Sequence, residues 1–102
     1  MWIAAIFDLP VSSAEDRKNY RMLRKKLLSS GFVAVQKSLL GRWVENKEFA
    51  DTVVRKLEKF VPLSGNVIFF YIPDVSFVNT LQLCNGNKIS PPSPPEPWRI
   101  FT

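Results

Sequence analysis

The sequence predicts an α+β fold, in which two helices cover one face of an antiparallel sheet. Three observations favour it. An apolar run at residues 2–7 opens the chain, and a second one at residues 66–72 lies near its end. Between them, residues 13–30 and 46–60 carry apolar side chains at helical spacing. Residues 32–44, which separate these two stretches, are rich in the apolar and β-branched residues typical of strands.

The first strand runs from Trp2 into a lone carboxylate, Asp8, and ends before Pro10 because proline cannot donate to a sheet ladder. Asp8 is therefore expected at the carboxyl end of a strand. A charged group at such a position can bind a ligand while it stays partly solvated on a rigid scaffold. An equally open alternative is that Asp8 only caps the turn into the next helix.

The first helix is expected to start near Ser13, because Ser12 and Glu15 have capping-box spacing, and to end at residues 29–31. Its apolar stripe consists of Tyr20, Leu23 and Leu27. The rest of its surface is basic, with Arg17, Lys18, Arg21, Arg24, Lys25 and Lys26. No acid follows Asp16 in this helix to form i,i+4 pairs. We therefore favour phosphate binding over a merely solvated face.

The remaining elements complete the order strand, helix, strand, strand, helix, strand. Residues 32–40 predict the second strand, and Gly41 predicts a bulge or bend before a third strand at 42–44. The second helix has Asn46 as its N-cap and one apolar face, formed by Phe49, Ala50, Val53, Leu57 and Phe60. Residues 66–72 give the fourth strand. This order is that of the ferredoxin-like fold, with the first and fourth strands central.

Both central strands are apolar on both faces, whereas two helices can cover only one face of the sheet. A second copy of the chain packed on the other face is the simplest solution, so we expect a homodimer. A fifth, edge strand is expected at residues 80–84, which ends a domain at 1–84. The proline-rich tail, 85–102, carries Trp98, Ile100 and Phe101, which we expect to dock on another chain.

The composition restricts the classes of partner and of catalytic site that this chain can have. A formal charge of +5 and a pI near 9.7 favour an anionic partner such as nucleic acid. The chain has no histidine, which excludes histidine-based zinc sites and catalytic triads and leaves carboxylates and metal ions to carry any catalysis. No apolar run has the length of a membrane span, and no signal peptide is recognisable. A cytoplasmic location, without membrane contact, is expected, and the single Cys84 agrees with a reducing compartment.

Several short motifs together resemble one family: Phe7-Asp8-Leu9-Pro10, Arg17-Lys18, Arg24-Lys25, Leu27-Leu28, Gly31-Phe32, Gln36 and Ser38. Over roughly residues 1–85 the chain resembles the second Cas family, small CRISPR-associated proteins that partner the spacer integrase. The resemblance implies a homodimer, bound between two integrase dimers, that holds double-stranded DNA during insertion into the CRISPR array. Many members are described as metal-dependent endonucleases on RNA or double-stranded DNA. The resemblance thus implies that Asp8 is the catalytic residue and Mg²⁺ ligand, and that Arg17, Lys18 and Arg24 contact phosphates.

One departure from the family is that Phe7 stands where tyrosine is common, so a role that needs its hydroxyl group is absent. Three hypotheses follow. The first is a DNA-binding subunit of the integration complex, which grips phosphates without reading sequence. The second is an Mg²⁺-dependent endonuclease in which Asp8 from each protomer meets near the twofold axis. The third is an RNA-recognition module; the segment 31–33 lies on the wrong strand for its motif, so this hypothesis ranks last.

Overall fold

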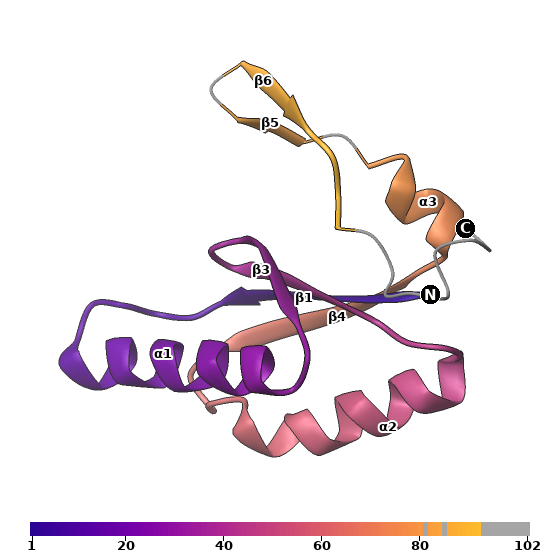
Figure 1. Cartoon of the computed structure of the whole chain (residues 1–102). Helices are drawn as coiled ribbons and strands as arrows, with labels where there is room; N and C mark the ends of the chain where they lie inside the picture. Colours follow the sequence, from indigo (N-terminus) through magenta and orange to yellow (C-terminus); the bar gives the residue numbers. More distant parts are fainter. Residues whose placement is uncertain (81, 85, 93–102) are drawn as a thin grey trace.

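The computed structural model describes residues 1–80, 82–84 and 86–92. Four antiparallel strands form a sheet in the order β2-β3-β1-β4, with α1 and α2 on one face (Figure 1). The elements of this domain are β1 (Trp2–Asp8), α1 (Ala14–Ser29), β2 (Val33–Gln36), β3 (Leu39–Trp43), α2 (Lys47–Leu57), the 3₁₀ turn η1 (Glu58–Phe60) and β4 (Asn66–Ile72). The predicted ferredoxin-like order and the central position of β1 are confirmed. The predicted central position of β4 is wrong: β4 is an edge strand, because β1 pairs with β4 on one side and with β3 on the other.

Alternation along β1 divides the sheet into two unlike faces. Ile3, Ala5 and Phe7 point under the helices and are buried. They pack with Leu23 and Leu27 of α1 and with Ala50, Val53 and Leu57 of α2. The intervening side chains, Trp2, Ala4 and Ile6, lie on the opposite face, which no helix of the ferredoxin-like core covers (Figure 1). We call this the open face.

The N-terminus of α1 is capped one residue later than the spacing predicted. Ser13, not Ser12, is the N-cap: its Oγ accepts a hydrogen bond from the backbone N–H of Asp16 at 3.0 Å. The Asp16 carboxylate accepts in return from the N–H of Ser13 at 3.3 Å. An aspartate at the third helical position can thus close the capping box in place of Glu15. The helix ends before Gly31, whose φ of +92° suits a residue without Cβ.

The bend predicted at Gly41 is wrong. The hairpin turns at Lys37 and Ser38, and Gly41 lies inside β3. Glycine there makes room for the indole of Trp2, since an added Cβ would lie 3.4 Å from the Cε3 atom of that ring. The irregularity in the hairpin instead falls on β2, where the register shifts between Ala34 and Gln36.

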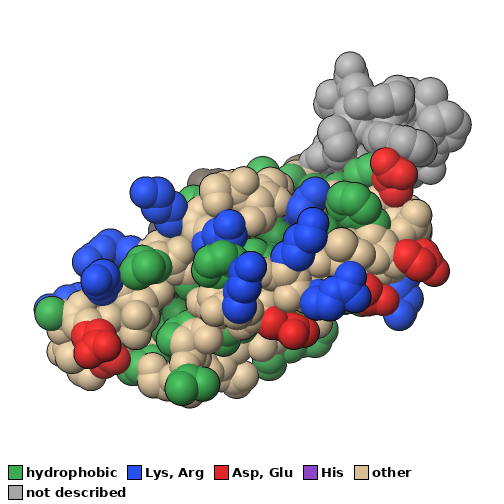
Figure 2. Space-filling view, turned by 90° about the horizontal axis from the view of Figure 1, so that it is seen from below, with side chains coloured by type: hydrophobic (Ala, Val, Ile, Leu, Met, Phe, Trp, Pro, Cys, Tyr) green, Lys and Arg blue, Asp and Glu red, His purple; other side chains and the backbone are tan. Residues whose placement is uncertain are grey.

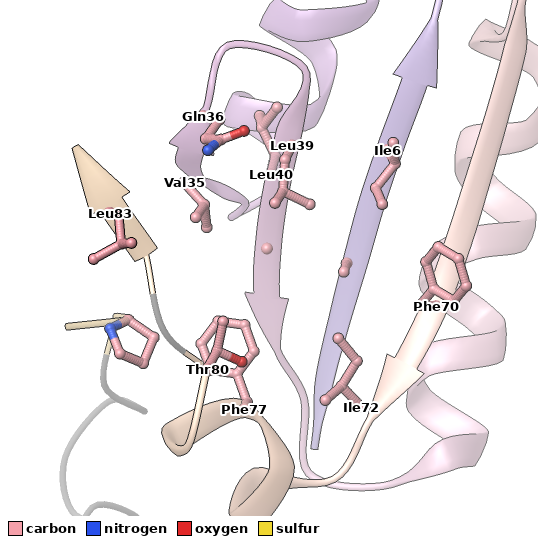
Figure 3. A pocket seen from close by; sticks show the side chains of 13 residues that line it. Ile6, Val35, Gln36, Leu39, Leu40, Phe70, Ile72, Phe77, Thr80 and Leu83 are labelled. Atoms are coloured by element: carbon pink, nitrogen blue, oxygen red, sulfur yellow. The ribbon is translucent and has the colours of Figure 1, made fainter. Parts of the chain in front are cut away.

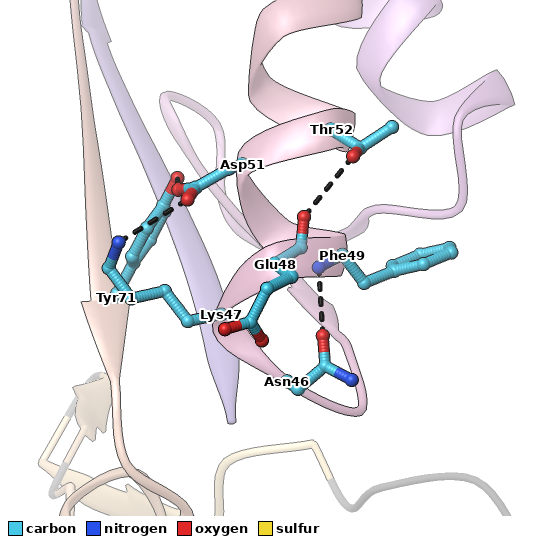
Figure 4. Close-up of polar contacts among 7 residues, drawn as sticks. All are labelled: Asn46, Lys47, Glu48, Phe49, Asp51, Thr52 and Tyr71. Carbon is cyan, nitrogen blue, oxygen red and sulfur yellow. Dashed lines mark hydrogen bonds and ion pairs between the residues drawn. The ribbon is translucent and has the colours of Figure 1, made fainter.

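The start of α2 is fixed by polar contacts (Figure 4). Asn46 caps the helix as predicted, with its Oδ1 accepting from the N–H of Phe49 at 2.8 Å. One turn on, Asp51 accepts from the hydroxyl of Tyr71 on β4 at 2.7 Å and from Nζ of Lys47 at 3.3 Å. The Tyr71 hydrogen bond, aided by Lys47, lowers the pKa of Asp51. Burial and the same hydrogen bond raise the pKa of Tyr71 to about 12.

After β4 the chain crosses to the open face. The short helix α3 (Asp74–Val78) follows directly, and its Phe77 stacks on Trp2 with ring centroids 4.3 Å apart. The predicted fifth strand exists as β5 (Gln82–Cys84), but it is not an edge of the main sheet. It pairs with β6 (Asn87–Ile89), because Gly86, at φ +82°, allows a tight turn. This hairpin stands over the open face (Figure 1).

The predicted domain boundary after residue 84 lies inside the β5–β6 hairpin. The tail residues for which docking is expected, Trp98, Ile100 and Phe101, lie outside the described residues.

Candidate nucleic-acid interface

A depression of about 590 Å³ lies at the carboxyl end of β1, and we call it the Asp8 depression. Three parts of the chain line it: the end of β1 and the following loop, the first turns of α1, and the turn between β2 and β3. Its lining residues are Phe7, Asp8, Leu9, Val11, Arg17, Tyr20, Arg21, Lys37 and Ser38. Asp8 is exposed there, as the sequence predicted for a carboxylate at a strand end.

Three cations line this depression with Asp8. Arg17 and Arg21 lie one helical turn apart on α1, and Lys37 projects from the β2–β3 turn. Arg17 is anchored at its guanidinium, where Nη1 donates to the carbonyl of Val11 at 3.3 Å. Within the part of the chain that the structure describes, none of the three forms an ion pair with a carboxylate. The depression therefore carries net positive charge that suits a phosphate group.

Tyr20 connects the three parts of the chain that line the Asp8 depression. Its hydroxyl donates to the carbonyl of Lys37 at 3.1 Å and lies 3.0 Å from Oγ of Ser38. Its ring packs against Phe7 at a centroid distance of 5.3 Å. Helical spacing predicted Tyr20 only as part of the apolar stripe, and Lys37 was not among the predicted phosphate contacts. The signal for Lys37 was present, since Lys37-Ser38 is a polar pair inside an otherwise strand-like run.

The other predicted phosphate contacts of α1 lie apart from this depression or at its border. Arg24 is half-buried, and its Nε donates to the carbonyl of Lys37 at 3.3 Å. Arg24 therefore stabilises the turn between β2 and β3. Lys18 is exposed but does not line the depression. Lys25 lines a different hollow, toward the C-terminal end of α1. The structure thus divides the basic residues of α1 between two surfaces.

The residues of one chain do not complete a magnesium site. Mg²⁺ requires near-octahedral oxygen ligation, commonly with one or two carboxylates and several waters or phosphates. Among the residues that the structure describes, Asp8 is the single acid that lines the depression. Across residues 1–80, 82–84 and 86–92, no three His, Cys, Asp or Glu side chains come together in a way that could hold a metal ion. Phe7 is buried in the core and offers no oxygen.

The open face begins next to Asp8. Ile6, Ile68 and Phe70 remain 41%, 46% and 46% exposed, although they are large and apolar. A hollow of about 320 Å³ lies between this face and the chain that crosses it. Figure 3 shows Ile6, Phe70 and Ile72 on the sheet side of that hollow, with Phe77 and Leu83 on the other side. Alternation along β1 places Asp8 on the same side as Ile6.

Comparison with known proteins identifies the family of this chain. A family model described as CRISPR associated protein Cas2 matches residues 1–80. The chain belongs to the Cas2 family. A protein of Ligilactobacillus salivarius named CRISPR-associated endoribonuclease Cas2 is 36% identical over 89 residues, which are 87% of either chain. One of the same name from Parvibaculum lavamentivorans is 36% identical over 91 residues, 89% of either chain.

The crystal structure of Streptococcus pyogenes Cas2 at pH 6.5 superposes with a TM-score of 0.57 at 22% sequence identity. The match covers 72% of this chain and 87% of the other, and it confirms the Cas2 fold. Within the described residues of this family member, no helix combines the length and the apolarity that a membrane span requires.

Proposed function

We propose that this Cas2-family chain acts in CRISPR spacer acquisition, as a homodimeric subunit that holds double-stranded DNA for the CRISPR integrase. The observation that carries the proposal is the Asp8 depression, in which Arg17, Arg21 and Lys37 stand without carboxylate partners among the described residues. Two of these cations sit on a helix and the third on a turn held by Tyr20. Contacts of this kind position a duplex by its phosphates and do not read bases.

The homodimer is supported by the open face. Ile6, Ile68 and Phe70 form an apolar surface, and monomers rarely leave large surfaces of this kind in water. A second copy offers the same surface, so the two can pack about a twofold axis. In such a dimer the two Asp8 depressions would border one interface, and their cations would add along a single bound duplex.

The test is duplex binding by a variant with Arg17→Ala and Arg21→Ala. Loss of two phosphate contacts should weaken binding about equally for duplexes of unrelated sequence. Arg55→Ala is the matched control, because Arg55 is an exposed arginine of α2 that lies outside the Asp8 depression. Unchanged affinity in the double variant would refute the proposal, and so would a loss confined to one sequence.

A second candidate function is endonuclease activity. The relatives from L. salivarius and P. lavamentivorans are named endoribonucleases, and Asp8 lies exposed beside cations that suit a phosphodiester. Since Asp8 is the single carboxylate among the described residues that line the depression, the Asp8 of a second copy would have to complete any Mg²⁺ site. The test is cleavage of RNA and of duplex DNA with Mg²⁺ or with EDTA. Cleavage that persists in Asp8→Asn, or in EDTA, would refute this assignment.

The tail is proposed as a docking segment. Its apolar residues Trp98, Ile100 and Phe101 suit contact with the sister protomer or with the integrase. Truncation after Pro92 keeps the β5–β6 hairpin and separates the two partners. Loss of the dimer would identify the sister protomer, whereas an intact dimer that no longer co-purifies with integrase would identify the enzyme. If both assemblies survive, the tail is not a docking segment.

A further inference from the structure

A second basic surface lies on the helical side of the molecule, between the C-terminal half of α1, the end of α2 and η1. It consists of two adjoining hollows, of about 430 and 480 Å³, which share Lys26, Lys59 and Phe60. We call the pair the α1–α2 groove. It has no lining residue in common with the Asp8 depression. The groove is therefore a separate site, and the proposal for the Asp8 depression leaves it unexplained.

Among the described residues, the groove is lined by cations and by no acid. Its charged lining residues are Lys25, Lys26, Arg42, Lys56 and Lys59. In the described parts of the chain, none of the five lies within ion-pair distance of a carboxylate. The nearby acid Asp51 is engaged with Tyr71 and Lys47 instead. Figure 2 shows Lys and Arg side chains spread across this helical face, with hydrophobic side chains between them. The local charge thus favours an anionic ligand.

Two aromatic rings stand exposed in the same groove, at positions where the sequence predicted buried side chains. Phe49 is 47% exposed and Phe60 is 39% exposed. The Arg42 guanidinium lies 5.4 Å from the Phe49 centroid. Two cations lie over the Phe60 ring, Nζ of Lys26 at 4.5 Å and Nζ of Lys59 at 5.5 Å from its centroid. The groove therefore combines cations with partly exposed rings.

We propose that the α1–α2 groove binds an unpaired segment of a nucleic-acid strand. Lys26, Lys56 and Lys59 would contact successive phosphates, and a base would stack on Phe60. Surfaces that bind single strands combine a basic track with aromatic side chains, because an unpaired base offers its flat face to a ring. A duplex hides those faces, and an acidic peptide satisfies the cations without using the rings. The inference extends the proposed nucleic-acid function by a second site with a different strand preference.

The test measures binding of a fluorescein-labelled oligothymidylate of about ten nucleotides by fluorescence anisotropy, with the full-length protein. Phe60→Leu keeps an apolar side chain but removes the ring, so affinity should fall about 5- to 150-fold, the range expected when one stacked base is lost. Phe60→Trp keeps an aromatic ring at this position, so its affinity for the oligothymidylate should be close to that of wild type. Leu28→Ala is the matched apolar control, since Leu28 is an exposed residue of α1 outside both hollows.

Salt dependence tests the phosphate contacts. Lys26→Ala should reduce the slope of log K against log salt by about 0.7, the value for one contact to a single strand. Arg55→Ala should leave that slope unchanged, because Arg55 lines neither hollow. Duplex binding should be unaffected by Phe60→Leu, which separates this site from the Asp8 depression.

The inference is overturned if Phe60→Leu binds oligothymidylate as wild type does. It is also overturned if a peptide of about ten glutamates competes as well as the oligonucleotide, which would identify an acidic protein segment as the ligand. Failure of wild type to bind any duplex would instead refute the proposed function, whatever the result with the single strand.

Discussion

Phe70→Ala should weaken the homodimer about 10- to 150-fold. Phe70 lies on the open face and keeps 46% of its surface exposed in one chain. Full burial of a phenylalanine side chain stabilises by about 1.5–3 kcal/mol, so roughly half of that, about 0.75–1.5 kcal/mol, remains to be gained when a partner covers it. A twofold interface contains this residue twice, which gives about 1.5–3 kcal/mol per dimer.

Sedimentation equilibrium at several protein concentrations would measure the dimer dissociation constant of each variant. Leu63→Ala is the control, because Leu63 is a fully exposed apolar residue in the loop before β4, outside the open face. Circular dichroism would establish that both variants remain folded. A dissociation constant that Phe70→Ala leaves within a few-fold of wild type would refute the open face as the interface.

Three further predictions concern single side chains. Subtracting the tyrosinate absorbance of Tyr71→Phe from that of wild type isolates the ionisation of Tyr71, which should occur near pH 12. The free energy of unfolding should fall between pH 10 and 12, because the tyrosine loses its proton at lower pH in the unfolded chain than in the folded one. Asp51→Asn removes the negative charge that accepts from the Tyr71 hydroxyl and leaves a weaker amide acceptor, so it should lower the pKa of Tyr71. Tyr20→Phe should cost about 1 kcal/mol of unfolding free energy and weaken duplex binding, whereas the cap variant Asn46→Ala should cost about as much and leave binding intact. Asp8→Asn should bind duplex DNA at least as tightly as wild type in the same anisotropy assay, because it removes a negative charge beside the phosphate path.

Local patterns predicted the core of the fold well. The apolar runs of β1 and β4, the N-cap at Asn46 and the helix end near Gly31 each depend on a few neighbouring residues. The sequence also predicted that β1 is apolar on both of its faces, and the structure shows the second of these as the open face. Errors occurred where a distant residue decides the outcome. Gly41 was predicted as a bend, but the ring of Trp2, far away in sequence, explains the glycine.

The candidate site could be predicted only in part, for the same reason. Asp8 and the basic helix were visible in the sequence, but Lys37 joins them through the hydroxyl of Tyr20, which spans 17 residues. Helical spacing placed Phe49 and Phe60 on the buried face, yet the edges of that face lie outside the core. A pattern of period 3.6 gives the centre of an apolar stripe more reliably than its borders.

The most direct test of the central claim is the salt dependence of duplex DNA binding. Arg21→Ala should bind more weakly, and its slope of log K against log salt should be smaller than that of wild type by about 0.9, the value for one lost phosphate contact. Arg55→Ala should keep the wild-type slope. A slope that Arg21→Ala leaves unchanged would contradict the claim that the cations of the Asp8 depression hold the duplex.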